Sequence, residues 1–139
     1  MRKRALWILL AVVAILAVVF FCLWQAERGD DSQISRLCQS SASEAYYAFR
    51  DYRTEGDERD YWSGVAAFRT FMQAYLMLND GSDAEYLDCS ELYAHMLLDM
   101  PSVCGHIEAL IDAMAILGQD YTDPNGYLRI TALKNELIR

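Results

Sequence analysis

The chain has 139 residues, of which 54% are hydrophobic and 23% are charged. This composition excludes a disordered or low-complexity protein, and the length allows one ordinary domain at most. Asp and Glu number 20 against 12 Lys and Arg, giving a net charge of −8. We therefore expect no nucleic acid as a partner, because binding to its backbone requires a basic face.

Residues 5–24 contain no charged side chain and consist almost entirely of apolar residues. At about 1.5 Å per residue, a helix of this length crosses the ~30 Å hydrocarbon core of a bilayer. Trp7 and Trp24 stand near its two ends, where indole rings favour the headgroup level. The pattern predicts a transmembrane signal-anchor helix at residues 5–24 that contacts membrane lipid.

The residues that flank this stretch predict its orientation. Residues 1–4 include three basic side chains, whereas residues 25–32 include three acidic ones. Because basic flanks favour the cytoplasmic side, we expect residues 1–4 in the cytoplasm. Residues 25–32 are then a juxtamembrane linker and residues 33–139 an extracytoplasmic domain. The predicted localisation is the cell membrane, with a single span.

Three other interpretations of the apolar stretch are weaker. A cleaved signal peptide has an apolar region of about 7–15 residues and a small residue three positions before the cut, where cleavage after Ala26 would place Trp24. A lipoprotein signal has a small residue before its cysteine, but Cys22 follows two phenylalanines. A buried core helix would need a polar face in so small a protein, because twenty consecutive apolar positions leave no surface for water. Secretion after signal cleavage stays open as the alternative localisation.

The chain beyond the linker has the periodicity of amphipathic helices. Apolar residues recur at three- and four-residue intervals, with no alternation typical of strands. The first helix is predicted to end near Gly56, and Asp57 caps a second helix that ends before Asn79. Ser82 and Glu85 have the spacing of a capping box and predict the start of a third helix.

Two further helices complete the predicted domain. Pro101 suits the first turn of a fourth helix that runs to Gly118, and Pro124 suits the start of a last helix. Helices this short are marginal alone in water, so they must bury their apolar stripes against one another. The predicted fold class is all-α: a single N-terminal transmembrane helix followed by a small antiparallel bundle of about four or five amphipathic helices.

The cysteines outside the apolar stretch are Cys38, Cys89 and Cys104, and each falls on an apolar stripe. We predict that they are small buried hydrophobic side chains. In a straight helical hairpin, the backbones of Cys89 and Cys104 are separated by roughly 10 Å along the axis, beyond the ~7 Å limit for a disulfide. Cys38–Cys89 and Cys38–Cys104 bonds stay open, although we do not expect either one.

Catalytic and metal-binding signals are weak. His95, Asp99, Cys104 and His106 approach one another if the chain folds back near Met100, but the closely spaced ligand pairs typical of zinc sites are absent. No nucleophile motif or glycine-rich phosphate loop is present. We predict no metal, no cofactor and no enzymatic activity; an extracytoplasmic enzyme that uses His95, Asp99 and His106 is the third hypothesis.

All nine tyrosines lie beyond the apolar stretch. Tyrosine and tryptophan are enriched at the energetic centres of protein interfaces. The candidate binding patch flanks the first interhelical turn and consists of Tyr46, Tyr47, Tyr52, Tyr61 and Trp62. The simpler interpretation is that these rings line the edge of a small core with their hydroxyls in water.

The sequence thus predicts a non-catalytic interaction module at the outer face of the membrane, with another protein as its partner. The alternative is an extracytoplasmic small-molecule-binding or sensor domain that acts through a membrane partner. In that case the core of the bundle would hold a pocket.

Overall fold

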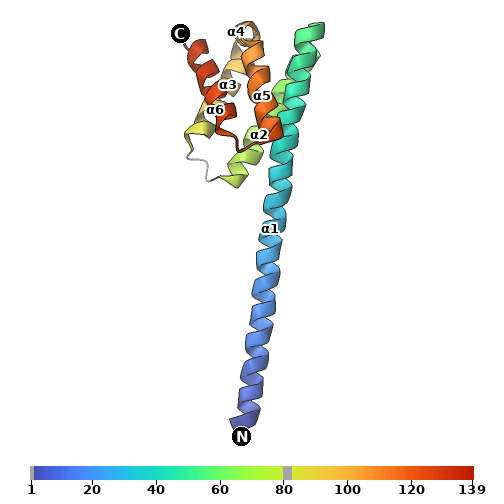
Figure 1. Ribbon diagram of the computed structural model, residues 1–139, viewed down its shortest axis with the longest axis vertical. Helices are drawn as coiled ribbons and strands as arrows, with labels where there is room; N and C mark the ends of the chain where they lie inside the picture. Colours follow the sequence, from blue (N-terminus) through green and yellow to red (C-terminus); the bar gives the residue numbers. More distant parts are fainter. Residues whose placement is uncertain (1, 80–82) are drawn as a thin grey trace. The chain divides into compact units, whose positions relative to one another are not determined.

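The computed structural model describes the backbone of residues 2–79 and 83–139, with the side chains of residues 13–23, 31–79 and 83–139. These residues form helices joined by short connections and contain no strand, so the all-α prediction is confirmed. The chain divides into two compact units, Met1–Gln33 and Ile34–Arg139. The helices, labelled in Figure 1, are α1 (Arg2–Glu55), α2 (Glu58–Leu78), α3 (Ala84–Leu98), α4 (Met100–Gly105), α5 (Ile107–Gln119) and α6 (Pro124–Leu137).

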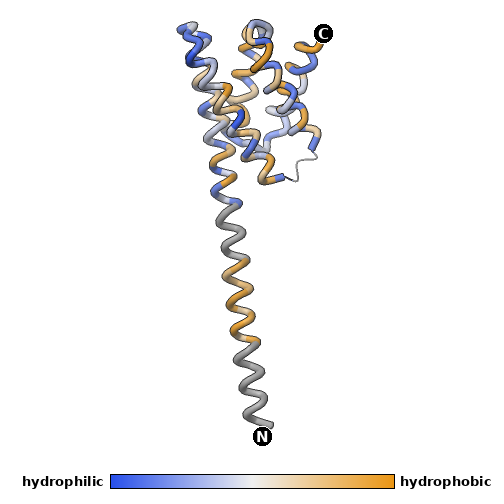
Figure 2. Tube along the Cα trace, turned by 180° about the vertical axis from the view of Figure 1, so that it is seen from behind, coloured by the Kyte–Doolittle hydropathy of each residue, from blue (hydrophilic) through white to orange (hydrophobic). Residues whose placement is uncertain are grey.

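The first unit is helical, and α1 begins in it. The side chains of residues 13–23 are all apolar and all exposed, and Figure 2 shows them as an unbroken hydrophobic segment. Within the described residues, no helical stretch combines the length and apolarity that a membrane crossing requires. The predicted anchor, residues 5–24, lies only partly among the residues whose side chains are described. The predicted linker, residues 25–32, is part of α1.

An aspartate caps the start of α2, α4 and α6, where its side chain accepts a hydrogen bond from a backbone N–H of the first turn. Asp57 accepts from Arg59 N at 2.9 Å, and Asp123 accepts from Asn125 N at 2.9 Å. The predicted starts of α2 and α6 are therefore confirmed. Gly56 precedes Asp57 with a φ of 73°, a left-handed conformation that glycine adopts without a steric penalty and that ends α1 before α2 begins.

The predicted fourth helix from Pro101 to Gly118 is wrong, because the chain turns after Gly105 and forms α4 and α5 instead. His106 leaves the helical conformation, with φ −118° and ψ 22°, and its N–H bonds back to Val103 O at 3.0 Å. Glycine has a low helix propensity, so a turn costs little at this position. The short α4 then buries Val103, while α5 packs separately.

The predicted capping box of α3 pairs Glu85 with a residue whose structure is not described, so it stays a prediction. The carboxylate of Glu85 accepts a hydrogen bond from the Tyr75 hydroxyl at 2.6 Å, which links α3 to α2. Asp83 occupies the N-cap position, with no hydrogen bond from its side chain to the helix, and Ser82 lies outside the described residues.

Side-chain contacts close the second unit into a ring in the order α1, α2, α3, α6, α5 and back to α1. Apolar faces point into this ring, and the fully buried α1 residues recur at helical spacing: Cys38, Ala42, Ala45 and Phe49. The contacts between neighbours are Cys38–Phe71, Tyr61–Met96, Lys134–Asp88, Arg129–Asp112 and Arg53–Glu108.

Neighbouring helices run antiparallel except for one pair. Asp88 of α3 contacts Thr131 and Lys134 of α6, and Glu91, further along α3, also contacts Lys134. Residue numbers therefore increase together along α3 and α6, and these two helices are parallel. The predicted antiparallel arrangement is wrong for this pair, because a closed ring with an odd number of helices cannot alternate direction throughout.

Candidate functional site

The predicted aromatic patch does not form one surface, because Tyr61 belongs to the core. Its side chain is fully buried, and its hydroxyl donates a hydrogen bond to Met96 O at 3.0 Å. Desolvation raises the pKa of this phenol. Tyr52 is half-buried and packs edge-on against Tyr61, with 5.5 Å between the ring centroids. The ring of Tyr61 is therefore not available as an exposed binding surface, and the prediction is wrong for this residue.

Tyr46, Tyr47 and Arg50 form a cluster at the surface, which we call the Tyr47 cluster; Tyr47 is exposed, whereas Tyr46 and Arg50 are half-buried and Tyr46 also packs against the core. The two tyrosine rings meet edge-on with their centroids 5.0 Å apart, and Tyr47 is 53% exposed. The guanidinium carbon of Arg50 lies 4.9 Å from the Tyr47 ring centroid and 5.7 Å from that of Tyr46. Residues three and four apart on a helix are neighbours, which places Arg50 on both rings. This spacing could have identified Arg50 from the sequence.

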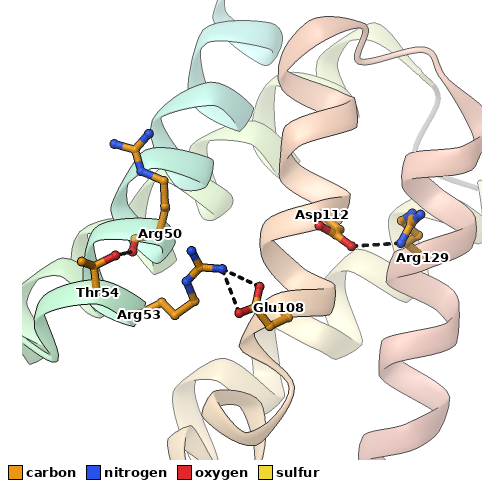
Figure 3. Close-up of polar contacts among 6 residues, drawn as sticks. All are labelled: Arg50, Arg53, Thr54, Glu108, Asp112 and Arg129. Carbon is orange, nitrogen blue, oxygen red and sulfur yellow. Dashed lines mark hydrogen bonds and ion pairs between the residues drawn. The ribbon is translucent and has the colours of Figure 1, made fainter.

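The Arg50 guanidinium also contacts the carboxylate of Asp51 at 3.1 Å. The hydrogen bond with Asp51 raises the pKa of Arg50. Figure 3 shows a different role for Arg53, one turn further along α1, whose guanidinium points to Glu108 of α5 and contacts it at 2.7 Å. In that view, Arg50 extends away from α5. Arg53 therefore joins two helices, whereas Arg50 lies against the rings of Tyr46 and Tyr47.

Three shallow grooves adjoin the Tyr47 cluster or continue from it across the surface of the second unit. The α1–α5 groove has a volume of about 380 Å³ and is lined by residues that include Ser43, Tyr46, Tyr47 and Gln119. The α1–α2 groove has a volume of about 590 Å³ and shares Tyr47 with it. Tyr47 is thus a ridge between these two hollows.

The third groove lies between α2 and α3 and has a volume of about 420 Å³. Ala66 and Thr70 of α2 line both this groove and the α1–α2 groove, so the two grooves adjoin each other along α2. Trp62 and Tyr93 line this third groove. The two exposed parts of the predicted patch, Tyr47 and Trp62, therefore belong to different hollows of one continuous surface.

The three grooves differ in charge. The described residues that line the α1–α5 groove include no charged side chain. The α1–α2 groove contains Glu44, Asp51 and Asp60 and no Lys or Arg among its described lining residues. The α2–α3 groove contains Arg69 as its charged residue. A partner that covers this surface would therefore meet neutral, acidic and basic hollows in succession.

The α1–α5 groove is built on a close approach of two helices. Gly118 lies so near Ser43 that a Cβ on the glycine would come within 2.7 Å of the serine Oγ. The Ser43 hydroxyl donates a hydrogen bond to Gly118 O at 3.1 Å, and the amide of Gln39 donates to Gln119 O. These bonds satisfy carbonyls in the last turn of α5 that lack a partner within their own helix.

The candidate metal ligands do not converge. Asp99 caps α4 by accepting from Ser102 N at 3.3 Å, and Nδ1 of His106 lies 3.3 Å from the Glu136 carboxylate. Cys104 forms a hydrogen bond with Tyr52, which raises the pKa of the tyrosine. Over the described part of the chain, no three His, Cys, Asp or Glu side chains gather as they would to hold a metal ion. His95 lies in the last turn of α3.

The thiols of the second unit occupy two environments. Cys38 and Cys89 are buried in the core, and desolvation raises the pKa of Cys38 to about 12 and also raises that of Cys89. Both thiols are therefore kept protonated and unreactive at neutral pH. Cys104 is partly exposed. All three are present as free thiols.

Comparison with known proteins gives no relative from which a role could be transferred. The chain matches no known protein family, no curated protein and no solved structure.

Proposed function

We propose that this protein is a membrane-anchored interaction module. Residues 5–24 hold the chain in the bilayer with residues 1–4 in the cytoplasm, and the helical domain binds another protein at the outer face of the membrane. The Tyr47 cluster and its adjoining grooves are the binding surface. The protein performs no catalysis in this role.

One observation carries the anchoring part of the proposal: apolar side chains are exposed all around the helix at residues 13–23. Phe20, for example, is 73% exposed. Apolar surface in water costs roughly 25 cal/mol per Å², so a continuous sleeve of such side chains requires an apolar environment. A lipid bilayer supplies this environment, and the apolar sequence continues on both sides to fill residues 5–24.

The Tyr47 cluster supports the binding part of the proposal. Tyr and Arg are among the residue types that contribute most to protein interfaces, and stacking holds Tyr47 and Arg50 in place before a partner arrives. The core does not need these exposed side chains, because its own aromatic residues, such as Phe49 and Phe68, are fully buried. A partner would therefore find a preformed surface.

Site-specific photo-crosslinking in native membranes tests the binding part. A photoreactive amino acid in place of Tyr47 is expected to capture a discrete partner band. The matched control places the same group at Leu128, which is 65% exposed on α6 and outside all three grooves. Capture at both positions alike, or at neither, would contradict the proposal.

A small-molecule-binding domain remains the second candidate, and the α1–α5 groove favours it. Its volume of about 380 Å³ falls within the ~300–1,000 Å³ typical of ligand pockets. Ala115 lines this groove, so Ala115→Trp would fill it. The sensor hypothesis predicts a ligand that raises the melting temperature of the wild-type chain and has no effect on Ala115→Trp.

A further inference from the structure

The α1–α2 groove differs from its neighbours in the uniform sign of its charge. Glu44 and Asp51 line it from α1, and Asp60 lines it from α2. Asp51 is paired with Arg50, whereas neither Glu44 nor Asp60 takes part in an ion pair among the described residues. Carboxylates on both walls of one groove repel each other, and a cation placed between them would relieve that repulsion.

Small side chains make up part of the lining of this groove, and we call this part its small-residue floor. They are Ala48 on α1 and Ser63, Ala66 and Ala67 on α2, and the groove has a volume of about 590 Å³. Small residues let a third helix approach the two helix backbones closely. The lining runs from Glu44 to Asp51 on α1, a distance of about 10 Å along the helix axis, which matches roughly two turns of a partner helix.

The backbone of the groove excludes recognition by strand addition. Both walls are α-helices, whose backbone hydrogen bonds are made within each helix, so they offer no unpaired edge to an extended peptide. The Thr70 hydroxyl donates its hydrogen bond within α2, to Ala66 O at 3.1 Å. Side chains of the groove, rather than its backbone, must make the polar contacts with a partner here.

We propose that the α1–α2 groove binds a positively charged helical segment of the partner protein, whose Lys or Arg side chains pair with Glu44 and Asp60 while its helix lies on the small-residue floor. This proposal rests on the interaction function described above and names the chemistry of the partner. Charge complementarity selects this occupant: a second copy of the chain would bring further negative charge, since the net charge is −8.

The probe for this proposal is a synthetic amphipathic peptide of Leu, Ala and Lys with its lysines on one face, paired with the same peptide in which Gln replaces each Lys. Binding to the full chain in detergent micelles is measured by fluorescence anisotropy. The lysine peptide is expected to bind and to weaken as salt is added, because salt screens exposed charges. Equal affinity for the two peptides, or no binding of either, would overturn the proposal.

A pair of charge-matched double variants locates the binding. Glu44→Gln/Asp60→Asn removes two carboxylates from the groove, and Glu55→Gln/Glu58→Gln removes two outside it. Each double variant changes one residue of α1 and one in the first turn of α2, so their effects on net charge and on the α2 helix dipole are alike. The groove variant is expected to weaken peptide binding about tenfold and the control less than about twofold.

Three outcomes separate this proposal from the function on which it rests. An equal loss in both double variants would mean general attraction to an acidic protein and would overturn the groove assignment. Self-association of the chain that the groove variant abolishes would identify a second copy as the occupant and would also overturn it. If the groove variant loses peptide binding but crosslinking from position 47 still captures its partner, the cationic-helix proposal fails for that partner while the interaction function stands.

Discussion

Two parts of the same helix, residues 13–23 and residues 34–55 of α1, place apolar side chains in opposite ways. In the first part, every side chain is apolar and exposed. In the second part, apolar side chains recur at helical spacing, and one face is buried against α2 and α5 while the other carries polar residues. Apolar side chains on one face of a helix can be buried in a protein core. Apolar side chains all around a helix, which we call a sleeve, are shielded from water only by a surrounding apolar medium. This difference underlies both the anchor and the domain that we assign.

The largest expected effect comes from charges placed within the sleeve. Leu16→Arg combined with Val19→Arg should release the chain from membranes, because each charge near the centre of a bilayer costs about 2.5–3.5 kcal/mol. The fraction of protein that remains in the membrane pellet after alkaline extraction measures this release. Leu37→Arg, at an exposed position of the second unit, is the control and should stay in the pellet. Retention of the double variant would contradict the anchor.

The second effect concerns the buried stripe. Phe49 is fully buried and covers Gly64 so closely that a Cβ on this glycine would come within 2.6 Å of its ring. Phe49→Ala should therefore lower the free energy of unfolding of the domain by about 3–5 kcal/mol. Urea unfolding followed by tryptophan fluorescence measures the loss. Membrane retention should not change, and a joint loss of folding and retention would mean that the two parts of α1 are not independent.

A smaller effect depends on pH and is confined to the domain. Desolvation opposes ionisation of Asp88, but hydrogen bonds from Lys134 and Thr131 outweigh it and lower the pKa of this carboxyl. A lowered folded-state pKa stabilises the domain above the unfolded value of about 3.9, and this contribution disappears as the pH falls through the folded-state pKa. We expect the domain to lose stability on acidification below roughly pH 4.

Asp88→Asn checks the source of this acid sensitivity. The variant should be less stable than wild type at neutral pH and should show a shallower dependence of unfolding free energy on pH in the acid range. Both side chains of the Asp88–Lys134 pair are mostly buried, with exposures of 18% and 15%, so screening by solvent does not mask the effect. An unchanged acid slope would assign the sensitivity to other carboxyls.

The smallest expected effect is on stability, and it tests whether Tyr47, on the exposed face of residues 34–55, serves packing or binding. Tyr47→Ala should change the free energy of unfolding by less than about 0.5 kcal/mol, because exposed positions away from the core contribute little. Phe49, two residues further along the same helix, is the matched buried position, where the same change to Ala is expected to cost several kcal/mol. A loss of several kcal/mol at Tyr47 would show that the ring is structural and would remove it from the binding surface.

Local features of the sequence predicted local features of the fold. The aspartate caps of α2 and α6 were predictable because capping depends on the side chain and the next few amides. The break at Gly105 was not, since an apolar stripe continues across it and only the packing of α4 and α5 distinguishes one helix from two. The parallel pairing of α3 with α6 depends on closure of the ring, which no single segment encodes.

The candidate site was predictable only in part, for the same reason. Tyr46 and Tyr47 were included in the predicted patch, but the burial of Tyr61 depends on a hydrogen bond to Met96 in another helix. The three carboxylates of the α1–α2 groove come from two helices, so their proximity becomes visible only once those helices are packed. His95, Asp99 and His106 illustrate the converse, because nearness in sequence did not bring them together.

Labelling of an exposed cysteine in intact cells tests the central claim most directly. Leu98 is 87% exposed at the end of α3, so Leu98→Cys, in a chain whose Cys22 and Cys104 are changed to Ser, offers one accessible thiol for a membrane-impermeant maleimide. We expect labelling of a membrane-bound, full-length chain before the cells are lysed. Labelling only after lysis, or recovery of a labelled product that lacks residues 5–24, would contradict it.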